Sequence, residues 1–123
     1  MCFVVHPNYP DPLIAEQDIV CYKVGTASCD KESFFSEYQD YKYKLNELQP
    51  VVELSPDPFY GNRCLITAGY HSYHPDHVRL ELCQLQRNTY VVVKCIIPKG
   101  ATYYYDPLFL EYVSTQIIAQ EIL

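Results

Sequence analysis

The sequence predicts an α+β fold, with a mixed, mostly antiparallel sheet and one main helix. Three observations support this prediction. Apolar runs rich in β-branched and aromatic residues recur along the chain between turn residues, which is typical of strands. A single segment places apolar residues at helical spacing. The 123 residues, 49% of them hydrophobic and 20% charged, suffice for one globular domain.

The chain divides near its start. Residues 1–17 contain three prolines among turn-forming residues, so we expect an extended N-terminal arm. Residues 18–123 are expected to form the single α+β domain. Its first clear strand covers residues 19–24 and ends at Gly25. The polar residues 26–37 are expected to form a loop.

The middle of the chain predicts three further β segments. Residues 41–45 alternate between polar and apolar, which favours a strand. Prolines on both sides of residues 51–54 leave room only for a short edge strand. Residues 64–68 predict another strand, and residues 70–73 are expected to connect it to a helix.

The helix and the remaining strands follow. Residues 76–87 carry apolar side chains at helical spacing, and a proline precedes them in the position that suits a first turn. Residues 89–97 form a continuous apolar run, which predicts a central strand. After a Pro-Lys-Gly turn, residues 101–105 predict a strand or bend, and residues 112–123 predict one closing strand.

Charge and composition exclude several classes of function. The chain has nine basic and fifteen acidic residues, and the basic ones are scattered, so we expect no nucleic-acid polymer as a partner. We find no signal peptide and no apolar stretch long enough for a membrane span, so we expect no membrane association. The six cysteines include no C-x-x-C pair and are expected to stay reduced in the cytoplasm. No catalytic, metal or cofactor motif is recognisable, so we expect no catalytic residue, no metal and no cofactor.

Thirteen tyrosines make tyrosine the compositional outlier. They suit the half-buried faces of a sheet, and they also suit a binding site, because each combines a flat apolar face with a polar tip. Tyr73 ends a segment that lies between a predicted strand and the predicted helix. Backbone amides at such a junction favour an anion, and His71 and Ser72 would add hydrogen bonds. The alternative is a plain connection.

Three lysines are candidate anion ligands. Lys23 lies in the first strand, Lys94 lies in the central strand, and Lys99 follows in its turn. A lysine within an apolar strand must reach solvent or find a partner. Lys23 and Lys94 would form a cationic site if they faced one cleft, and the alternative is exposure on the solvent side of the sheet.

Three histidines follow an H-x-x-H-x-x-H spacing, at positions 71, 74 and 77. Imidazoles three residues apart can share a metal on one helical face. Pro75 interrupts this spacing, and His71 and His74 precede the helix. We therefore favour a role in a binding loop or at the surface over a metal site.

Three segments together resemble a family of small uncharacterised proteins from phages and prophages of gut Bacteroidetes bacteria. The resemblance covers about residues 18–123 and leaves the arm outside. It rests on Ile19–Val24, Gly69–Tyr73, Val91–Gly100, Tyr103 and Tyr112–Ser114. It implies a phage or prophage protein and supplies no catalytic residues.

A weaker resemblance is to the ADP-ribosyltransferase fold. Enzymes of that fold carry an aromatic-plus-cation first strand, a hydroxyl-bearing second motif and a late glutamate. The pair Tyr22-Lys23, then Ser72, then Glu111 follow this order, with lysine where arginine is usual and without the usual hydroxyl residues beside Ser72. This resemblance implies a scaffold that binds an NAD-derived nucleotide without turning it over.

These observations lead to one functional hypothesis. The chain would be a non-catalytic phage accessory protein of the infected bacterium's cytoplasm, a homo-oligomer that binds and sequesters a host nucleotide immune signal. Its alternatives are an ADP-ribosyltransferase-like or nucleotide-degrading enzyme, and a protein-docking inhibitor of a host defence enzyme that uses the tyrosines at 103–105. The expected ligand-binding residues are Tyr22, Lys23, His71, Ser72, Tyr73, Lys94, Lys99 and Tyr103.

Overall fold

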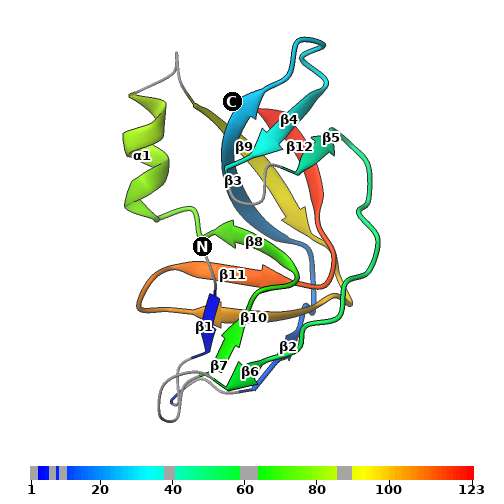
Figure 1. Cartoon of the computed structure of the whole chain (residues 1–123), viewed down its shortest axis with the longest axis vertical. Coiled ribbons are helices and arrows are strands. Elements are labelled where there is room, and N and C mark those ends of the chain that lie inside the picture. The colour runs from blue at the N-terminus through cyan, green and yellow to red at the C-terminus, as the bar shows by residue number, and fades with distance from the viewer. Residues whose placement is uncertain (1–2, 6–7, 9–10, 38–40, 59–63, 86–89) are drawn as a thin grey trace.

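A computed structural model describes residues 3–5, 8, 11–37, 41–58, 64–85 and 90–123 of the chain. Figure 1 shows the strands, with helix α1 lying to one side of them. The elements, in chain order, are β1 (Phe3–Val5), β2 (Leu13–Ile14), β3 (Ile19–Ala27), β4 (Ser33–Ser36), β5 (Lys42–Lys44), β6 (Asp57–Pro58), β7 (Cys64–Ile66), β8 (Tyr70–Tyr73), α1 (Val78–Gln84), β9 (Val91–Ile97), β10 (Thr102–Asp106), β11 (Glu111–Ser114) and β12 (Ile118–Ile122).

The strands form two sheets. The larger has nine strands, in the order β12-β9-β3-β8-β11-β10-β2, with β4 added beside β3 and β5 beside β4. The smaller has the order β1-β7-β6. Every pairing among the described strands is antiparallel. The predicted class, mainly antiparallel sheet with one helix, is therefore confirmed, whereas its mixed character is not.

The nine-stranded sheet curls back on itself. The chain leaving β5 meets the open edge of β12, where the Asn46 amide donates to the Ala119 carbonyl at 2.7 Å and the Gln49 amide to Ile117 at 3.1 Å. Strands β12, β9, β3, β4 and β5 thus enclose a common interior. Phe34, Val93 and the other side chains of the main core fill it.

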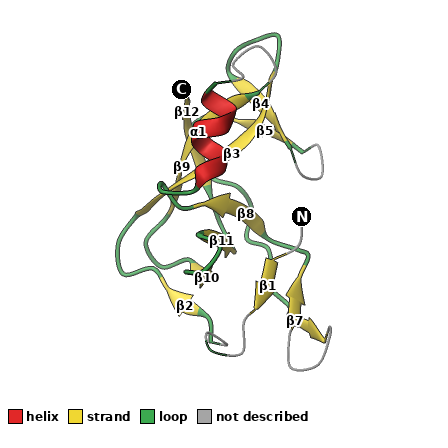
Figure 2. Cartoon of the chain, turned by 90° about the vertical axis from the view of Figure 1, so that its left-hand side faces the viewer, coloured by secondary structure: helices red, strands yellow, loops and turns green. Residues whose placement is uncertain are grey.

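Two further layers cover the outside of the sheet (Figure 2). Helix α1 packs Leu80 and Cys83 onto Val24 and Val92, which lie on the outer face of β3 and β9. The small sheet packs its own apolar side chains against β10 and β11. Strand β9 is covered on both faces and lies between β12 and β3, which explains its uninterrupted apolar sequence and confirms its predicted interior position.

Several expected elements differ in the structure. The loop predicted for residues 26–37 contains strand β4, and β3 continues through Gly25 to Ala27. A Cβ at position 25 would lie 2.0 Å from the Phe35 carbonyl oxygen, so this glycine permits a close approach of β4 and does not end the strand. The edge strand predicted for residues 51–54 does not form, although the Val52 amide donates to Thr115.

Two other corrections concern residues 70–73 and the end of the chain. The segment expected as a connection is strand β8, which pairs with β11. The closing strand predicted for residues 112–123 is two strands that pair in different places, β11 with β8 and β10, and β12 with β9. Within the predicted arm, β1 pairs with β7 and β2 with β10.

The predicted helix is confirmed but is shorter than expected. Helix α1 occupies Val78–Gln84, inside the predicted range, and residues 86–87 of that range lie outside the described residues. The same holds for residue 89 of the central strand and for residues 1–2, 6–7 and 9–10 of the arm. Cys21, Cys29, Cys64, Cys83 and Cys95 are free thiols, and Cys2 lies outside the described residues.

Candidate functional site

One line of residues crosses five neighbouring strands. The strand registers place Lys94 opposite Tyr22, Tyr22 opposite Tyr73, Tyr73 opposite Glu111 and Glu111 opposite Asp106. Directly opposite residues of antiparallel strands project to the same face of a sheet. We call these five residues the sheet row. It contains a cation, then two tyrosines, then two carboxyl groups, and on its far side the cation lies opposite a further carboxyl group, that of Glu121 in β12.

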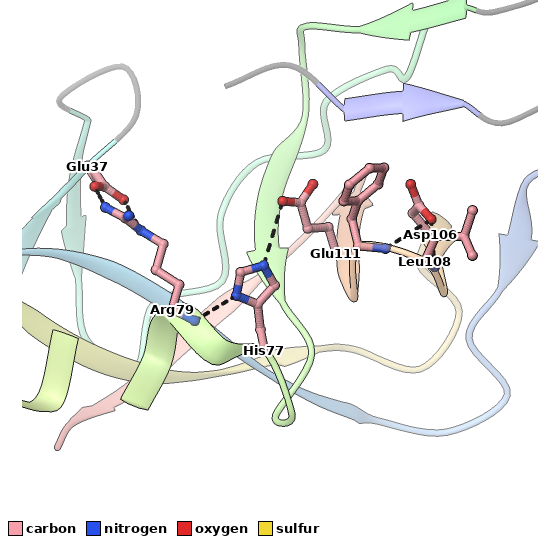
Figure 3. A network of polar contacts seen from close by, with 7 residues as sticks. Glu37, His77, Arg79, Asp106, Leu108 and Glu111 are labelled. Carbon is pink, nitrogen blue, oxygen red and sulfur yellow. Dashed lines mark hydrogen bonds and ion pairs between the residues drawn. The ribbon is translucent and has the colours of Figure 1, made fainter. Parts of the chain in front are cut away.

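His77 lies over the middle of the sheet row, just before α1. Its ring centroid is 4.4 Å from that of Tyr73, and its Nε2 lies 3.9 Å from Glu111 Oε1. Its Nδ1 accepts a hydrogen bond of 3.0 Å from the Arg79 amide, so the same side chain caps the helix. Figure 3 shows His77 between Arg79 and Glu111, with the Arg79 guanidinium turned toward Glu37.

A pocket of about 510 Å³ opens beside this histidine, between α1 and the sheet. Its volume falls within the range of roughly 300–1,000 Å³ that is usual for small-molecule sites. Tyr22 and Val92 contribute from β3 and β9. The other lining residues are Pro75, Asp76, His77, Val78, Leu80, Glu81, Gln84 and Leu123.

Burial alters the acid–base properties of this region. It lowers the pKa of His77, and burial together with the Asp106 charge raises the pKa of Glu111. Burial, with Glu111 nearby, raises the pKa of Tyr73 to about 12. At neutral pH His77 is therefore uncharged and Tyr73 keeps its proton, so both offer neutral hydrogen-bonding groups to a ligand.

Lys23 and Ser72 lie on the opposite face of the sheet, inside the enclosed core. Both side chains are buried. The Lys23 ammonium donates to the His71 carbonyl oxygen and lies 5.0 Å from the centroid of the Tyr43 ring. Desolvation lowers the Lys23 pKa, and desolvation raises the pKa of nearby Cys21 to about 11. The Ser72 hydroxyl has no hydrogen-bonding partner among the described residues.

Lys23 and Lys94 therefore do not share a cleft, and Lys23 does not reach solvent. Lys23 pairs with Val93, whereas Lys94 pairs with Tyr22, and neighbouring residues of a strand project to opposite faces. Lys94 is half-buried, lies opposite Tyr22 of β3 and Glu121 of β12, and is not among the residues that line the pocket. The condition set for a joint cationic site of the two lysines is not met, because one residue of strand register separates their faces.

Of the eight expected site residues, Tyr22 alone is among those that line the pocket, and Tyr73 and Lys94 lie outside the lining with the others. His71 Nε2 is 3.3 Å from the Thr67 carbonyl oxygen, and desolvation lowers its pKa to about 4. Lys99 is exposed in the turn after β9, where its amide donates to Asp18. The Tyr103 ring packs 6.0 Å from that of Tyr112 in the sheet. Of the expected residues, the structure brings together Tyr22, Tyr73 and Lys94.

The three spaced histidines diverge. His71 lies on β8, His74 stacks on Tyr112 at a centroid distance of 6.2 Å, and His77 caps α1. The described residues contain no group of three side chains able to hold a metal ion. The structure also differs from the strand-to-helix junction that was expected to bind an anion. Residues 70–73 belong to the sheet, and His77 caps the start of the helix.

The residues that carry the resemblance to the ADP-ribosyltransferase fold lie on both faces of the large sheet. Tyr22 and Glu111 belong to the sheet row, whereas Lys23 and Ser72 face the core. The sequence led us to favour a binding-loop or surface role for His77 over a metal site, and it did not point to Glu81 or Leu123. The spacing of His77 and Glu81 around the helix start carried a usable signal, because residues four apart lie on one helical face. Leu123 carried none, since it reaches the pocket only through the pairing of β12.

No family model matches this sequence, and no curated protein or solved structure matches it either. Among the described residues, no helix has the length and apolar character that a membrane crossing requires.

Proposed function

We propose that this protein binds and sequesters a small nucleotide-type ligand without converting it. The ligand would occupy the pocket between α1 and the sheet. In the setting implied by the resemblance to phage proteins, the ligand is a nucleotide signal of a host defence system. The protein then acts as a homo-oligomer in the cytoplasm of the infected bacterium.

One observation carries this proposal: Tyr22 lines the pocket, and Lys94, whose other neighbour in register is Glu121, lies opposite Tyr22 in the adjacent strand. An aromatic ring offers a flat surface on which any base can stack. A lysine next to that ring can neutralise a phosphate. Tyr73 and His77 continue the aromatic surface toward Glu111.

Native mass spectrometry tests the proposal directly. The purified protein is incubated with a panel of cyclic nucleotides and ADP-ribose derivatives. We expect a stoichiometric mass shift with at least one of them, recovery of that ligand intact after denaturation, and a subunit count from the same spectrum. Tyr22→Ala and Lys94→Met should each weaken binding at least tenfold, the equivalent of about 1.4 kcal/mol.

Lys99→Met is the matched control, because Lys99 is an exposed lysine in the turn after β9 and does not belong to the sheet row. Its binding should equal that of the unchanged protein. Equal losses in Lys99→Met and Lys94→Met would point to nonspecific charge attraction and count against the proposed site. Absence of a shift with every panel member would overturn the function.

An enzyme is the first alternative, and the same experiment distinguishes it. Glu111 and His77 face each other at 3.9 Å beside the aromatic surface, and their pKa values are shifted in opposite directions by burial. Such a pair could exchange a proton with a ligand. Recovery of a cleaved or transferred ligand, abolished by Glu111→Gln, would replace the binding proposal by this one.

The outer face of α1 favours a second candidate function, docking on a host protein. Val78, Leu82 and Leu85 are 64%, 56% and 79% exposed and follow helical spacing, so they form an exposed apolar stripe along the helix, of which Val78 also lines the pocket. The tyrosines at 103–105 do not supply such a surface, because all three are partly or fully buried. If no panel member binds, Leu82→Lys should abolish any inhibition of a host defence enzyme while the fold persists.

A further inference from the structure

We propose that the turn between β10 and β11 docks onto another protein, whose contact segment carries apolar side chains flanked by lysine or arginine. Residues 107–110 form this turn, and Leu108 and Phe109 are its anchor. Neither of these two residues lines the pocket between α1 and the sheet. The inference therefore goes beyond the proposed function and holds whether or not the pocket takes a nucleotide.

Two large apolar side chains are adjacent and exposed in this turn. Leu108 is 63% exposed and Phe109 is 65% exposed. Apolar residues that are scattered singly over a surface are ordinary, whereas adjoining ones call for an explanation. Phenylalanine is also among the residue types that are enriched in protein interfaces. The pair is therefore suited to anchor a partner.

The turn holds this pair rigidly in its exposed position. One oxygen of the Asp106 carboxylate, Oδ1, accepts hydrogen bonds from the Leu108 amide at 2.9 Å and from the Phe109 amide at 3.3 Å (Figure 3). Leu110 has a φ of 53°, in the left-handed region that leucine rarely adopts, and its carbonyl oxygen accepts from the His74 amide at 2.9 Å. Such a conformation persists only where the surrounding structure imposes it. A pre-organised anchor loses little freedom on binding.

Carboxyl groups surround the turn. Asp106 precedes it, and Glu111 follows it and lies opposite Asp106 in β11. Burial, and then the charges of Asp76 and Asp106, raise the pKa of Tyr105, so both carboxylates lie near this ring. Among the residues that the structure describes, no lysine or arginine forms an ion pair with any of these three carboxyl groups.

The neighbouring histidines do not neutralise these carboxyl groups. His74 Nδ1 accepts a hydrogen bond of 3.1 Å from the Asp76 amide, and His77 Nδ1 accepts one of 3.0 Å from the Arg79 amide. An imidazole nitrogen that accepts a hydrogen bond carries no proton, so both rings are neutral. The apolar anchor therefore lies in an acidic surface.

This charge distribution selects the kind of partner. A second copy of the chain, whose net charge is −6, would bring the same carboxyl groups together, and an anionic membrane would also present like charge. A basic protein surface meets the turn with opposite charge and with apolar side chains for the anchor. Charge complementarity therefore favours a basic protein over the other two.

Helix α1 can extend the contact beyond the turn. Figure 1 places the turn and α1 on the same side of the large sheet, and both face the viewer in Figure 2. A stable interface buries about 800 Å² on each partner, more than two side chains supply. The exposed apolar stripe of α1 lies on the side that such a partner would cover.

Fluorescence anisotropy with a labelled amphipathic peptide of leucine and lysine tests the inference. We expect this peptide to bind, and its affinity to fall as the salt concentration rises, because part of the attraction is between opposite charges. The same peptide with glutamate in place of lysine should bind at least about tenfold more weakly, the equivalent of about 1.4 kcal/mol.

Two pairs of variants locate the contact. Phe109→Ser should weaken binding of the leucine–lysine peptide at least about tenfold, whereas Val51→Ser, at a residue that is 69% exposed outside the turn, should leave it unchanged. Asp76→Asn should reduce the salt dependence, whereas Glu16→Gln, at an exposed acidic residue between β2 and β3, should not. Thermal melting checks that each variant is folded.

The inference is overturned if the leucine–lysine peptide does not bind, if Phe109→Ser binds it as tightly as the unchanged protein, or if Val51→Ser loses as much affinity as Phe109→Ser. A salt dependence that survives Asp76→Asn overturns it too, because the charge of the partner then has no counterpart at the turn.

Two further measurements exclude the other occupants. Binding to phosphatidylcholine vesicles that Phe109→Ser abolishes would assign the turn to a membrane, and self-association that Phe109→Ser abolishes would assign it to a second copy. Either result overturns the inference. The nucleotide panel is a separate experiment, so the proposed function stands or fails independently of these outcomes.

Discussion

Lys23 brings an amino group into the interior of the sheet without a carboxylate partner among the described residues. Its contacts there are the His71 carbonyl oxygen and the face of the Tyr43 ring. Desolvation lowers its pKa, which means that the folded protein disfavours the charged form. A buried, incompletely compensated charge of this kind reduces the free energy of unfolding.

We expect Lys23→Met to stabilise the protein at pH 7 by about 1 kcal/mol, since methionine fills a similar volume and the loss of one hydrogen bond offsets part of the gain. The advantage should shrink as the pH rises toward 10.5, the ordinary lysine value, because the unfolded lysine then also becomes neutral. Urea unfolding of both proteins at pH 7 and pH 10 measures this. An advantage independent of pH would show that the charge of Lys23 is not its cause.

His71 predicts a loss of stability in mild acid. Desolvation lowers its pKa from 6.5 to about 4, so the unfolded chain takes up a proton that the folded protein does not. As the pH falls from 6.5 to 4, the free energy of unfolding should drop by as much as about 3 kcal/mol. The measurement is urea unfolding across this pH range.

His71→Gln is the matched variant, because glutamine retains a donor for the Thr67 carbonyl oxygen and does not titrate. It should remove most of the acid dependence. Glu111 acts in the opposite sense, since its raised pKa stabilises the fold as the pH falls. The contribution of His71 is therefore the difference between the two proteins in how the free energy of unfolding changes with pH. If this pH dependence were the same in both proteins, the prediction would be contradicted.

At the scale of elements, the contact between β3 and β4 depends on a glycine. A Cβ at Gly25 would meet the Phe35 carbonyl oxygen at 2.0 Å and the Phe34 ring at 3.1 Å. Both belong to β4, the strand that pairs with residues 25–27. Because a backbone oxygen cannot move without displacing its strand, the two strands can pair this closely only when residue 25 lacks a side chain.

Gly25→Ala should therefore destabilise the protein by at least about 2 kcal/mol. Gly100→Ala is the comparison: its Cβ would meet no atom within 4 Å, and only its φ of 90° carries a cost, about 1 kcal/mol. Thermal and urea unfolding of both variants give the two values. A smaller loss of stability for Gly25→Ala than for Gly100→Ala would mean that β4 can move away from residue 25 at little cost.

At the scale of the whole molecule, the two sheets differ in how firmly they are held. Strands β3 and β9 pair over seven residues, and β9 is also paired with β12. The small sheet is joined through three residue pairs between β1 and β7 and two between β6 and β7. Short ladders contribute few cooperative hydrogen bonds, so the small sheet should open while the large one stays intact.

Native-state hydrogen exchange tests this difference. We expect the amides of β9 to exchange only through global unfolding, and those of β1 and β7 through an opening of lower free energy and weaker denaturant dependence. If the amides of both sheets exchanged with one free energy, the molecule would be a single cooperative unit and the prediction would be wrong.

The sequence by itself determined the elements whose signal is local. The apolar run of β9 identifies a covered strand wherever its partners lie. The spacing of Val78, Leu82 and Leu85 identified the helix, although the structure buries Leu80 and Cys83 and leaves those three exposed. Tyr22 and Tyr73 could be named as candidates because tyrosine combines a flat apolar face with a polar tip, and Lys94 because a lysine within an apolar strand must reach solvent or find a partner. Strand β4 escaped prediction, because its sequence is short and flanked by polar residues.

Only the tertiary structure decided which candidates meet. Pairing between β3 and β9, about seventy positions apart in the chain, sets the register that joins Tyr22 to Lys94 and turns Lys23 inward. A slip of one residue would exchange the two faces and bury Tyr22 instead. No local pattern fixes that register, since it follows from packing on both faces of the sheet at once. The same reason explains why His77 and Glu111 meet only in the folded chain.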